Sequence, residues 1–194
     1  MSKSLHNSSS YILLLLNLVL IISSNCNLFA MAIRIEDVCQ KTRDVAFCTK
    51  VLSSNPPTKT ADLREVGFMV IALTYYNTTS IRAKIQSLIS KSEKNPDLRD
   101  RLIMCDDVYG HALDILKRGV DYLKDRDYIG AMIARGAVGD DGVYCEDTFK
   151  RPPPAFKSPL TKENNDIERL SDMIMVISTM LCIAVHHDHP LLCE

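Results

Sequence analysis

The chain has 194 residues, of which 46% are hydrophobic and 24% are charged, so it can bury one sizeable core and is too short for two ordinary domains. Its 23 Lys and Arg residues against 24 Asp and Glu residues give a formal net charge of -1, which leaves no basic surplus to bind nucleic-acid phosphates. With only 7 Gly, 8 Pro and no Trp, the composition argues against a fold of many short strands and favours long helices.

Residues 1–32 have the pattern of a secretory signal peptide. Lys3 is the only charged residue before Arg34, and residues 11–22 form an apolar run, YILLLLNLVLII. A helix that spans a bilayer needs about 20 apolar residues, so an uncleaved membrane anchor is the weaker alternative. We therefore expect an exported chain that has one mature domain, over residues 33–194, and no membrane contact after cleavage.

Six of the seven cysteines follow this segment, and an even number of cysteines in an exported chain points to disulfides. They are Cys39, Cys48, Cys105, Cys145, Cys182 and Cys193. Six cysteines allow 15 pairings, and their spacing does not choose among them. The C-x2-C spacing of zinc knuckles does not occur, so we expect disulfides rather than metal ligands.

A short helical hairpin is predicted over residues 35–57. Two apolar stretches, each with one cysteine, are joined there by the polar pair Arg43-Asp44. A bridge between Cys39 and Cys48 would staple the two stretches together. The two prolines of the SSNPP sequence that follows then end the helical pattern.

The first long helix is predicted over residues 61–91, because apolar residues repeat there at alternating three- and four-residue steps. These residues are Leu63, Val66, Val70 and Leu73, and the pattern resumes at Ile85 and Leu88. The sequence NTTS interrupts the pattern, and its Asn77 begins a glycosylation sequon. Because a four-residue step from Leu73 places Asn77 on the inward face, a buried polar layer and a glycosylated surface both remain open.

Two further helices are predicted in the middle of the chain. The second begins at the N-cap Asn95 and runs to about Lys124, and the third begins at Asp125 or Asp127. Four of the seven glycines fall in the third helix, at Gly130, Gly136, Gly139 and Gly142. Each glycine costs up to about 1 kcal/mol relative to Ala in a helix interior, so this helix needs support from its neighbours.

A proline-rich link over residues 151–159 leads to a fourth helix, which we expect Thr161 to cap. The core residues of this helix step by three and four residues: Ile167, Leu170, Ile174, Ile177, Leu181 and Ala184. The four stripes together predict an all-α fold, in which a four-helix bundle over residues 61–186 follows the hairpin.

The C-terminal sequence HHDHPLLCE brings His186, His187 and His189 close in sequence to Cys182 and Cys193. Such a set of side chains suits zinc or copper, but the tail has no second element to fix the ligand geometry, so we expect no metal site. We predict instead a disulfide between Cys182 and Cys193 that folds the tail onto the last helix.

The motifs of common catalytic sites are absent from the sequence. It contains no G-x-S-x-G, H-E-x-x-H, G-x-x-x-x-G-K or G-x-G-x-x-G. The carboxylate pairs are adjacent in sequence, and neighbours on a helix point about 100° apart rather than at one substrate atom. Examples of such pairs are Asp106-Asp107, Asp140-Asp141 and Glu146-Asp147. We therefore expect no catalytic residues and no cofactor.

The order of these features resembles the plant invertase and pectin methylesterase inhibitor family, and the likeness covers nearly all of the mature chain. A signal peptide is followed by a Cys-x8-Cys hairpin, two cysteines 40 residues apart and a final amphipathic helix. The likeness is carried by CQKTRDVAFCTKVL from Cys39, ADL from Ala61, CDDVYGHALDIL from Cys105, DY from Asp127, CEDTFK from Cys145, and the segment from SPLTKEN at Ser158 to LSDMIMVIS at Leu170.

The resemblance implies an antiparallel four-helix bundle behind a helical hairpin, with Cys39 paired to Cys48 and Cys105 paired to Cys145. It also implies a secreted protein that inhibits a carbohydrate enzyme of the plant cell wall, or of the vacuole, and has no catalysis of its own. A secreted helical binding module without inhibitory activity is the alternative from another class.

The family offers two targets, pectin methylesterase and acid invertase. Invertase inhibitors of the family carry a Pro-Lys-Phe motif in the connection to the third bundle helix, whereas this chain has KDRDYI from Lys124 to Ile129. We therefore favour pectin methylesterase, although SPLTKEN is similar to members named as invertase inhibitors. We expect exposed polar positions of the bundle to make the contact, with Asp106, Asp107, Asp140 and Asp141 as candidates.

Overall fold

In the computed structural model of the chain, residues 34–55, 61–151 and 156–193 are described, and the predicted signal peptide lies outside them. These residues form helices and no strand. The helices are α2 (Ile35–Cys39), α3 (Val45–Ser53), α4 (Leu63–Lys91), α5 (Pro96–Asp125), α6 (Tyr128–Lys150), α7 (Thr161–Val185) and the 3-10 helix η3 (Pro190–Cys193). None of these helices has the length and apolar character that a membrane span requires.

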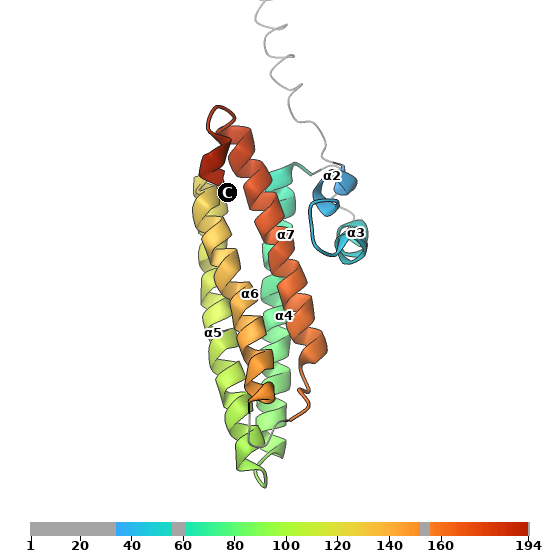
Figure 1. The fold of residues 1–194 in the computed structure, drawn as a ribbon, viewed down its shortest axis with the longest axis vertical. Coiled ribbons are helices and arrows are strands. Elements are labelled where there is room, and N and C mark those ends of the chain that lie inside the picture. The colour runs from blue at the N-terminus through green and yellow to red at the C-terminus, as the bar shows by residue number, and fades with distance from the viewer. Residues whose placement is uncertain (1–33, 56–60, 152–155, 194) are drawn as a thin grey trace, which may run out of the picture. The chain divides into compact units, whose positions relative to one another are not determined.

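Helices α4 to α7 run side by side in alternating directions, and α2 and α3 form a hairpin beside α7 (Figure 1). In the bundle α4 packs against α5, α5 against α6, α6 against α7, and α7 against α4. Helices α4 and α6 are therefore diagonal to each other. The predicted all-α fold, a four-helix bundle preceded by a helical hairpin, is confirmed.

Side-chain caps define the starts of three bundle helices. The carboxylate of Asp62 accepts from the backbone N–H of Glu65, whose own carboxylate accepts from the Asp62 N–H, so the pair forms a capping box. Asn95 and Asp127 cap α5 and α6 by a single bond each, in which the side-chain oxygen accepts from a backbone N–H three residues later. Asp127 thus begins the third bundle helix rather than Asp125. Each cap contributes about 1 kcal/mol to helix stability.

The prediction that Thr161 caps the fourth bundle helix is wrong. The N-cap of α7 is Leu160, which makes no side-chain capping bond, and Thr161 is the first helical residue. The Thr161 hydroxyl instead donates to Oε1 of Glu146 on α6, at 2.8 Å. A bond to a neighbouring helix has replaced the local cap.

The sequence pattern of α4 placed Asn77 on the inward face, but the residues that face the core are one position further along the chain. Thr74 and Thr78 are fully buried, whereas Asn77 is half-buried. The threonine hydroxyls donate to the carbonyl oxygens of Val70 and Thr74, so burial leaves neither hydroxyl unpaired. The core line of α4 therefore runs through the threonines, and the buried polar layer consists of them.

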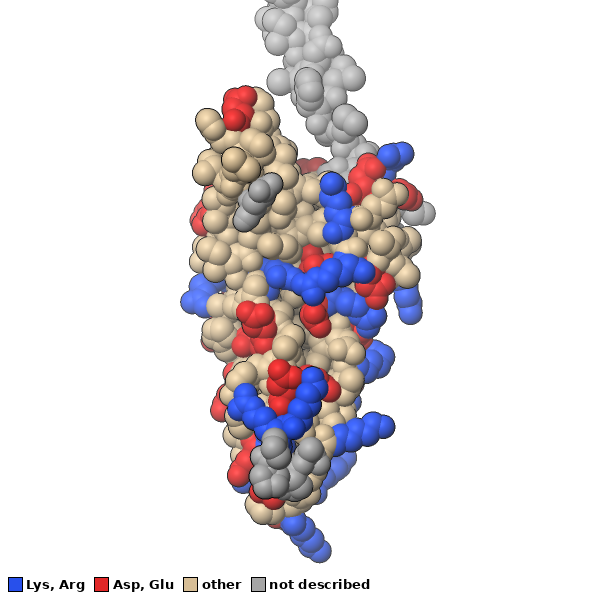
Figure 2. Space-filling view, viewed as in Figure 1, with Lys and Arg blue, Asp and Glu red and all other residues tan. Residues whose placement is uncertain are grey.

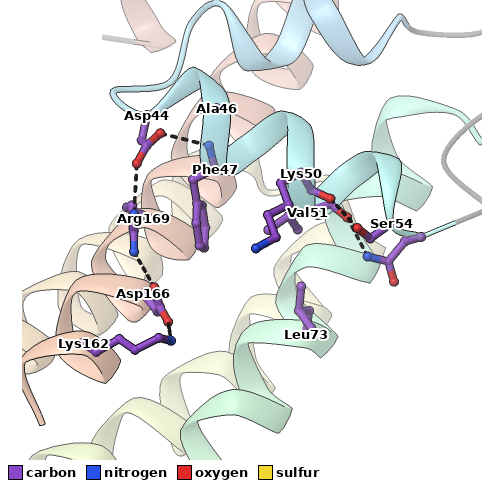
Figure 3. Close-up of a pocket in the computed structure, with 11 residues that line it drawn as sticks. Asp44, Ala46, Phe47, Lys50, Val51, Ser54, Leu73, Lys162, Asp166 and Arg169 are labelled. Carbon is purple, nitrogen blue, oxygen red and sulfur yellow. Dashed lines mark hydrogen bonds and ion pairs between the residues drawn. The ribbon is translucent and has the colours of Figure 1, made fainter.

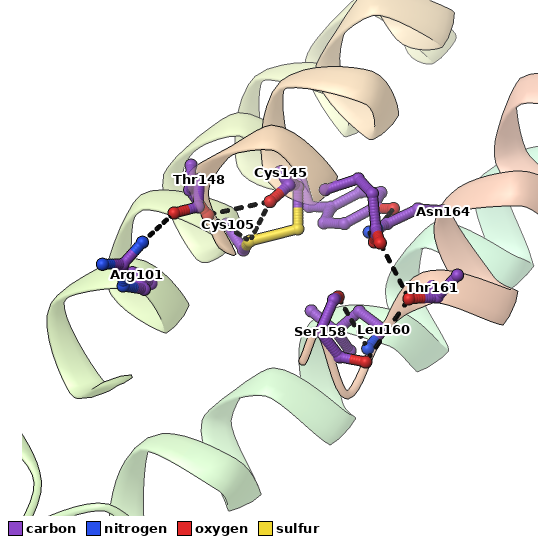
Figure 4. Close-up of a disulfide and its surroundings, with 10 residues drawn as sticks. Arg101, Cys105, Cys145, Thr148, Ser158, Leu160, Thr161 and Asn164 are labelled. Atoms are coloured by element: carbon purple, nitrogen blue, oxygen red, sulfur yellow. Dashed lines mark hydrogen bonds between the residues drawn. A yellow bond between two sulfur atoms is a disulfide. The ribbon is translucent and has the colours of Figure 1, made fainter. Parts of the chain in front are cut away.

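Three disulfides are present in the described residues. Cys39 is bonded to Cys48 within the hairpin, and Cys182 is bonded to Cys193, which holds η3 against α7. The third bond joins Cys105 of α5 to Cys145 of α6, with 4.8 Å between the Cα atoms (Figure 4). Both sulfurs of this bond lie in the bundle core, because Cys105 and Cys145 are 0% exposed.

Two of the α6 glycines allow α7 to approach closely. A Cβ atom on Gly139 would lie 2.7 Å from Oγ of Ser171, and one on Gly142 would lie 3.4 Å from the carbonyl oxygen of Asn164. These residues weaken α6 as an isolated helix but permit its packing in the bundle.

Candidate functional site

The outward side of α6 carries large apolar side chains that no other described element covers. Residues 129, 133, 136, 140 and 143 step by four and three, so they share one face of the helix. We call this face, together with Tyr144, the α6 outer stripe: Ile129, Ile133, Gly136, Asp140, Val143 and Tyr144. The side chains of Ile129, Ile133, Val143 and Tyr144 are 43%, 72%, 44% and 40% exposed. At about 1.5 Å per residue the stripe is roughly 22 Å long.

Few charges interrupt this face. Figure 2 shows an uncharged surface over the N-terminal half of α6, and charged side chains gather lower down and toward the hairpin. Asp140 is exposed within the stripe and forms no hydrogen bond or ion pair with any residue that the structure describes. At the end of the stripe, the guanidinium of Arg151 lies 5.1 Å from the centre of the Tyr144 ring. The stripe is thus an apolar surface with one free carboxylate.

The adjacent carboxylate Asp141 has a different environment. It turns toward α5, where an oxygen lies 2.8 Å from Nδ1 of His111. Burial raises the pKa of Asp141, and the bond to His111 only partly offsets this effect. Asp141 therefore ties α6 to α5, whereas Asp140 faces solvent.

Of the adjacent carboxylates Asp106 and Asp107, too, one is bonded to a neighbouring helix and the other is exposed. The guanidinium of Arg82 on α4 donates two hydrogen bonds to the carboxylate of Asp106, of 3.0 and 2.9 Å. Burial opposes ionisation of Asp106, but the bonds from Arg82 and Gln86 outweigh it and hold the pKa of this carboxyl below its usual value. Asp107 is exposed. Of the four predicted contact carboxylates, Asp106 and Asp141 therefore bond to neighbouring helices, and Asp107 and Asp140 face solvent.

A groove of about 570 Å³ lies where the hairpin meets the bundle (Figure 3). Arg169 of α7 forms a bond of 3.0 Å with Asp44, pairs with Asp166, and lies 4.3 Å from the centre of the Phe47 ring. Nearby, the backbone N–H of Arg43 donates to Asp172 at 2.8 Å. Arg169, Asp44 and Asp166 in this groove are paired with one another. We infer that these contacts hold the hairpin against α7 and that the groove is not a ligand site.

A buried polar network joins three bundle helices close to the Cys105–Cys145 bond (Figure 4). The Tyr109 hydroxyl donates to Oδ1 of Asn164 at 2.6 Å, and Nδ2 of Asn164 donates to Oε2 of Glu146 at 2.7 Å. Burial raises the pKa of Tyr109, which keeps its hydroxyl neutral and able to donate. The network links α5, α7 and α6 in that order.

The carboxylate of Glu146 makes this network sensitive to pH. Burial disfavours its charge, but bonds from Thr161, Asn164 and Ser158 together hold its pKa below the usual 4.5. A lowered pKa in the folded state adds stability above the unfolded-state pKa, and this stability is lost as the pH falls through the folded-state pKa.

We therefore predict that Glu146→Gln lowers the free energy of unfolding near neutral pH, and that its difference from the wild type shrinks below about pH 4.5. Urea denaturation of the variant and the wild type at a series of pH values measures the free energy of unfolding and how the difference depends on pH. A difference that stays constant from about pH 6 to about pH 3 would contradict the prediction.

The remaining predicted residues do not assemble into a chemical site. His186, His187 and His189 are exposed, and no group of three or more metal-ligating side chains occurs within residues 34–55, 61–151 and 156–193. Asn77 donates to the Leu73 carbonyl oxygen of its own helix at 2.8 Å. Its glycosylation stays a prediction.

The α6 outer stripe was not identified from the sequence, because exposed polar positions were expected to contact the target. The signal was present, because Ile129, Ile133 and Val143 lie off the core face that Ala131, Ala134 and Val138 define. Apolar residues outside a core stripe are candidates for contact with a partner.

Comparison with known proteins agrees with the fold and with the resemblance. The family described as "Plant invertase/pectin methylesterase inhibitor" matches residues 34–177. A pectinesterase inhibitor of Actinidia deliciosa is 30% identical over 183 residues, which cover 93% of this chain and 98% of the relative. A protein of Platanus acerifolia named "Putative invertase inhibitor" is 33% identical over 135 residues, or 70% of this chain and 74% of the relative.

Solved structures show the same likeness. The crystal structure of mutant form A of a pectin methylesterase inhibitor from Arabidopsis superposes with a TM-score of 0.67 at 25% identity. The match covers 75% of this chain and 95% of that chain.

Proposed function

The chain belongs to the plant invertase/pectin methylesterase inhibitor family, and we propose that its target is an extracellular pectin methylesterase. Members of this family are protein inhibitors of cell-wall carbohydrate enzymes, so the chain acts by binding an enzyme and is not itself an enzyme. The observation that carries the choice of target is the pectinesterase inhibitor that matches 93% of the chain.

The connection between α5 and α6 supports the same target. It is a tight turn in which Arg126 adopts a left-handed conformation (φ 60°) and Asp127 caps α6. The Pro-Lys-Phe motif expected of invertase inhibitors is absent from it. Acid invertase remains the second candidate because of the relative named "Putative invertase inhibitor", which is 33% identical.

The location of the protein follows from this function. We propose that residues 1–32 direct the chain into the secretory pathway and that the mature inhibitor reaches the cell wall, with the vacuole as the alternative for an invertase target. The three disulfides fit an oxidising compartment.

We propose that the enzyme contacts the α6 outer stripe. Exposed apolar side chains are typical of partner surfaces, and Ile133 is the most exposed apolar side chain of the stripe, at 72%. A helix packed in a disulfide-linked bundle loses little conformational freedom on binding, so the apolar contact is not offset by a large ordering cost.

An inhibition assay with two matched variants tests the function and the surface together. Ile133→Asp places a charge at the most exposed apolar position of the stripe, and Tyr76→Asp places one at an equally exposed position of α4, the diagonal helix, where Tyr76 is 71% exposed. We expect Ile133→Asp to raise the inhibition constant for pectin methylesterase about 100-fold, which corresponds to about 2.7 kcal/mol. Tyr76→Asp is expected to inhibit like the wild type.

Each protein is assayed against pectin methylesterase and acid invertase side by side at mildly acidic pH. Inhibition of invertase alone would overturn the choice of target, and no inhibition of either enzyme would favour the non-inhibitory binding module. Equal losses in Ile133→Asp and Tyr76→Asp would contradict the proposed contact surface.

A further inference from the structure

The fold gives no packing reason for a glycine at Gly136, and it leaves more space there than at any other glycine of the described residues. A Cβ atom built on each of the other glycines meets a neighbouring atom within 4 Å, as at Gly139 and Gly142, which admit α7. A Cβ atom on Gly136 would meet nothing within 4 Å. Its φ is not positive, so the backbone does not require glycine either.

The absence of a side chain at Gly136 therefore lowers the stability of α6 and improves no contact within the free protein. A glycine in a helix interior destabilises the helix by roughly the largest amount of any residue except proline. Gly136 lies in the middle of α6, eight residues after its first residue, Tyr128. Alanine at this position would make the helix more stable without a clash.

The surroundings of Gly136 on the helix suggest what it does. It lies three residues after Ile133 and four residues before Asp140, so it is flanked along the stripe by an exposed isoleucine and by the free carboxylate. The missing side chain leaves a notch between these two side chains, where the helix backbone itself is the surface.

We propose that Gly136 is a docking notch, at which a side chain of the target enzyme lies directly on the α6 backbone and presents a cation to Asp140. This inference rests on the proposed function and names the point of closest approach within it. A Lys or Arg side chain fits both features, because its apolar stem packs on an uncharged surface while its charged end reaches a carboxylate.

Charge complementarity favours such an enzyme side chain over a second copy of this chain. Asp140 is the only charged residue of the stripe, and a symmetric contact of two stripes would bring the two Asp140 carboxylates into the same apolar interface. Like charges that lose water in an interface repel each other and oppose association. A basic side chain of the enzyme instead neutralises Asp140.

The test compares stability and inhibition in the same variants. Gly136→Ala is expected to raise the midpoint of thermal unfolding by about 3 °C, because the helix gains stability. It is expected to weaken inhibition of pectin methylesterase several-fold, and Gly136→Leu, which fills the notch, is expected to weaken it about 100-fold. Stability and inhibition thus change in opposite directions.

Gly110→Ala is the matched control. Gly110 lies inside α5, and a Cβ atom there meets the Arg82 side chain of α4 at an ordinary 3.6 Å, away from the stripe. This variant is expected to gain stability and to inhibit like the wild type. Asp140→Asn supplies the charge test: its inhibition constant is expected to depend less on salt than that of the wild type.

The outcomes separate this inference from the proposed function. If the wild type inhibits pectin methylesterase and Gly136→Leu inhibits it equally well, the notch is overturned and the function stands. Unchanged salt dependence in Asp140→Asn would overturn the cation at the notch. Absence of inhibition by the wild type against both enzymes would overturn the function and the notch together.

Discussion

Replacing Cys145 with serine is expected to lower the free energy of unfolding by about 4 kcal/mol. The Cys105–Cys145 bond closes a loop of 40 residues, and in the chain-entropy model closure of a loop of that length lowers the entropy of the unfolded state and so raises its free energy by about this much. The bond also holds α6, whose glycines make it intrinsically weak, against α5. We expect helix content to fall with stability.

Urea denaturation followed by circular dichroism at 222 nm measures both quantities. The double variant Cys105→Ala/Cys145→Ser removes the thiol that the single variant leaves in the core, and it is expected to lose a similar amount of stability. Cys193→Ser is the comparison for a short loop, because its partner Cys182 is only 11 residues away. The expected loss there is smaller, about 3 kcal/mol. An unchanged unfolding midpoint for Cys145→Ser would refute the role given to the bond.

Replacing Asn164 with leucine is expected to lower the free energy of unfolding by about 3 kcal/mol. Asn164 is 3% exposed and bonds to Tyr109 on one side and Glu146 on the other. Leucine has the same branching and the same number of heavy atoms, but it leaves the fully buried Tyr109 hydroxyl without its acceptor and removes a donor from a carboxylate. The cost therefore comes from the unpaired Tyr109 hydroxyl and from the bond that Glu146 loses, rather than from a cavity.

The adjacent Asn165 provides the control, because it is exposed on the same helix. Asn165→Leu is expected to change stability by less than about 0.5 kcal/mol. A double-mutant cycle of Tyr109→Phe with Asn164→Leu is expected to give a coupling energy of about 1 kcal/mol or more, since each change removes the same bond. Additive effects in this cycle would mean that the two side chains do not interact in solution.

The four bundle helices could be predicted from the sequence because their signals are local. Apolar residues at three- and four-residue steps mark a core face whatever the partner, and Asn95 and Asp127 cap helices through backbone groups three residues away. Leu102, Tyr109 and Ile177 accordingly lie in the core. The family resemblance added the order of the helices and two cysteine pairings, which periodicity alone leaves open.

The contacts between helices could not be predicted in this way, because they depend on residues far apart in the sequence. Thr161 was expected to cap its own helix, but an acceptor 15 residues earlier, Glu146, takes its hydroxyl. In the sequence, Asn164 looks like one more polar residue of an amphipathic helix. It nevertheless lies in the core, because Tyr109 and Glu146 form hydrogen bonds with its side chain there.

The sequence by itself therefore determined the class of fold, the approximate extent of the helices, most of their core positions, and the family. The tertiary structure decided which residues outside the core face are used by neighbouring helices and which are left free. Gly136 and Gly139 are three residues apart and look alike in the sequence, but a Cβ atom on Gly139 would meet Ser171 of α7, while one on Gly136 would meet no neighbouring atom within 4 Å. Whether a missing side chain serves the fold or leaves room for a partner depends on the neighbouring helices, which only the packed bundle places.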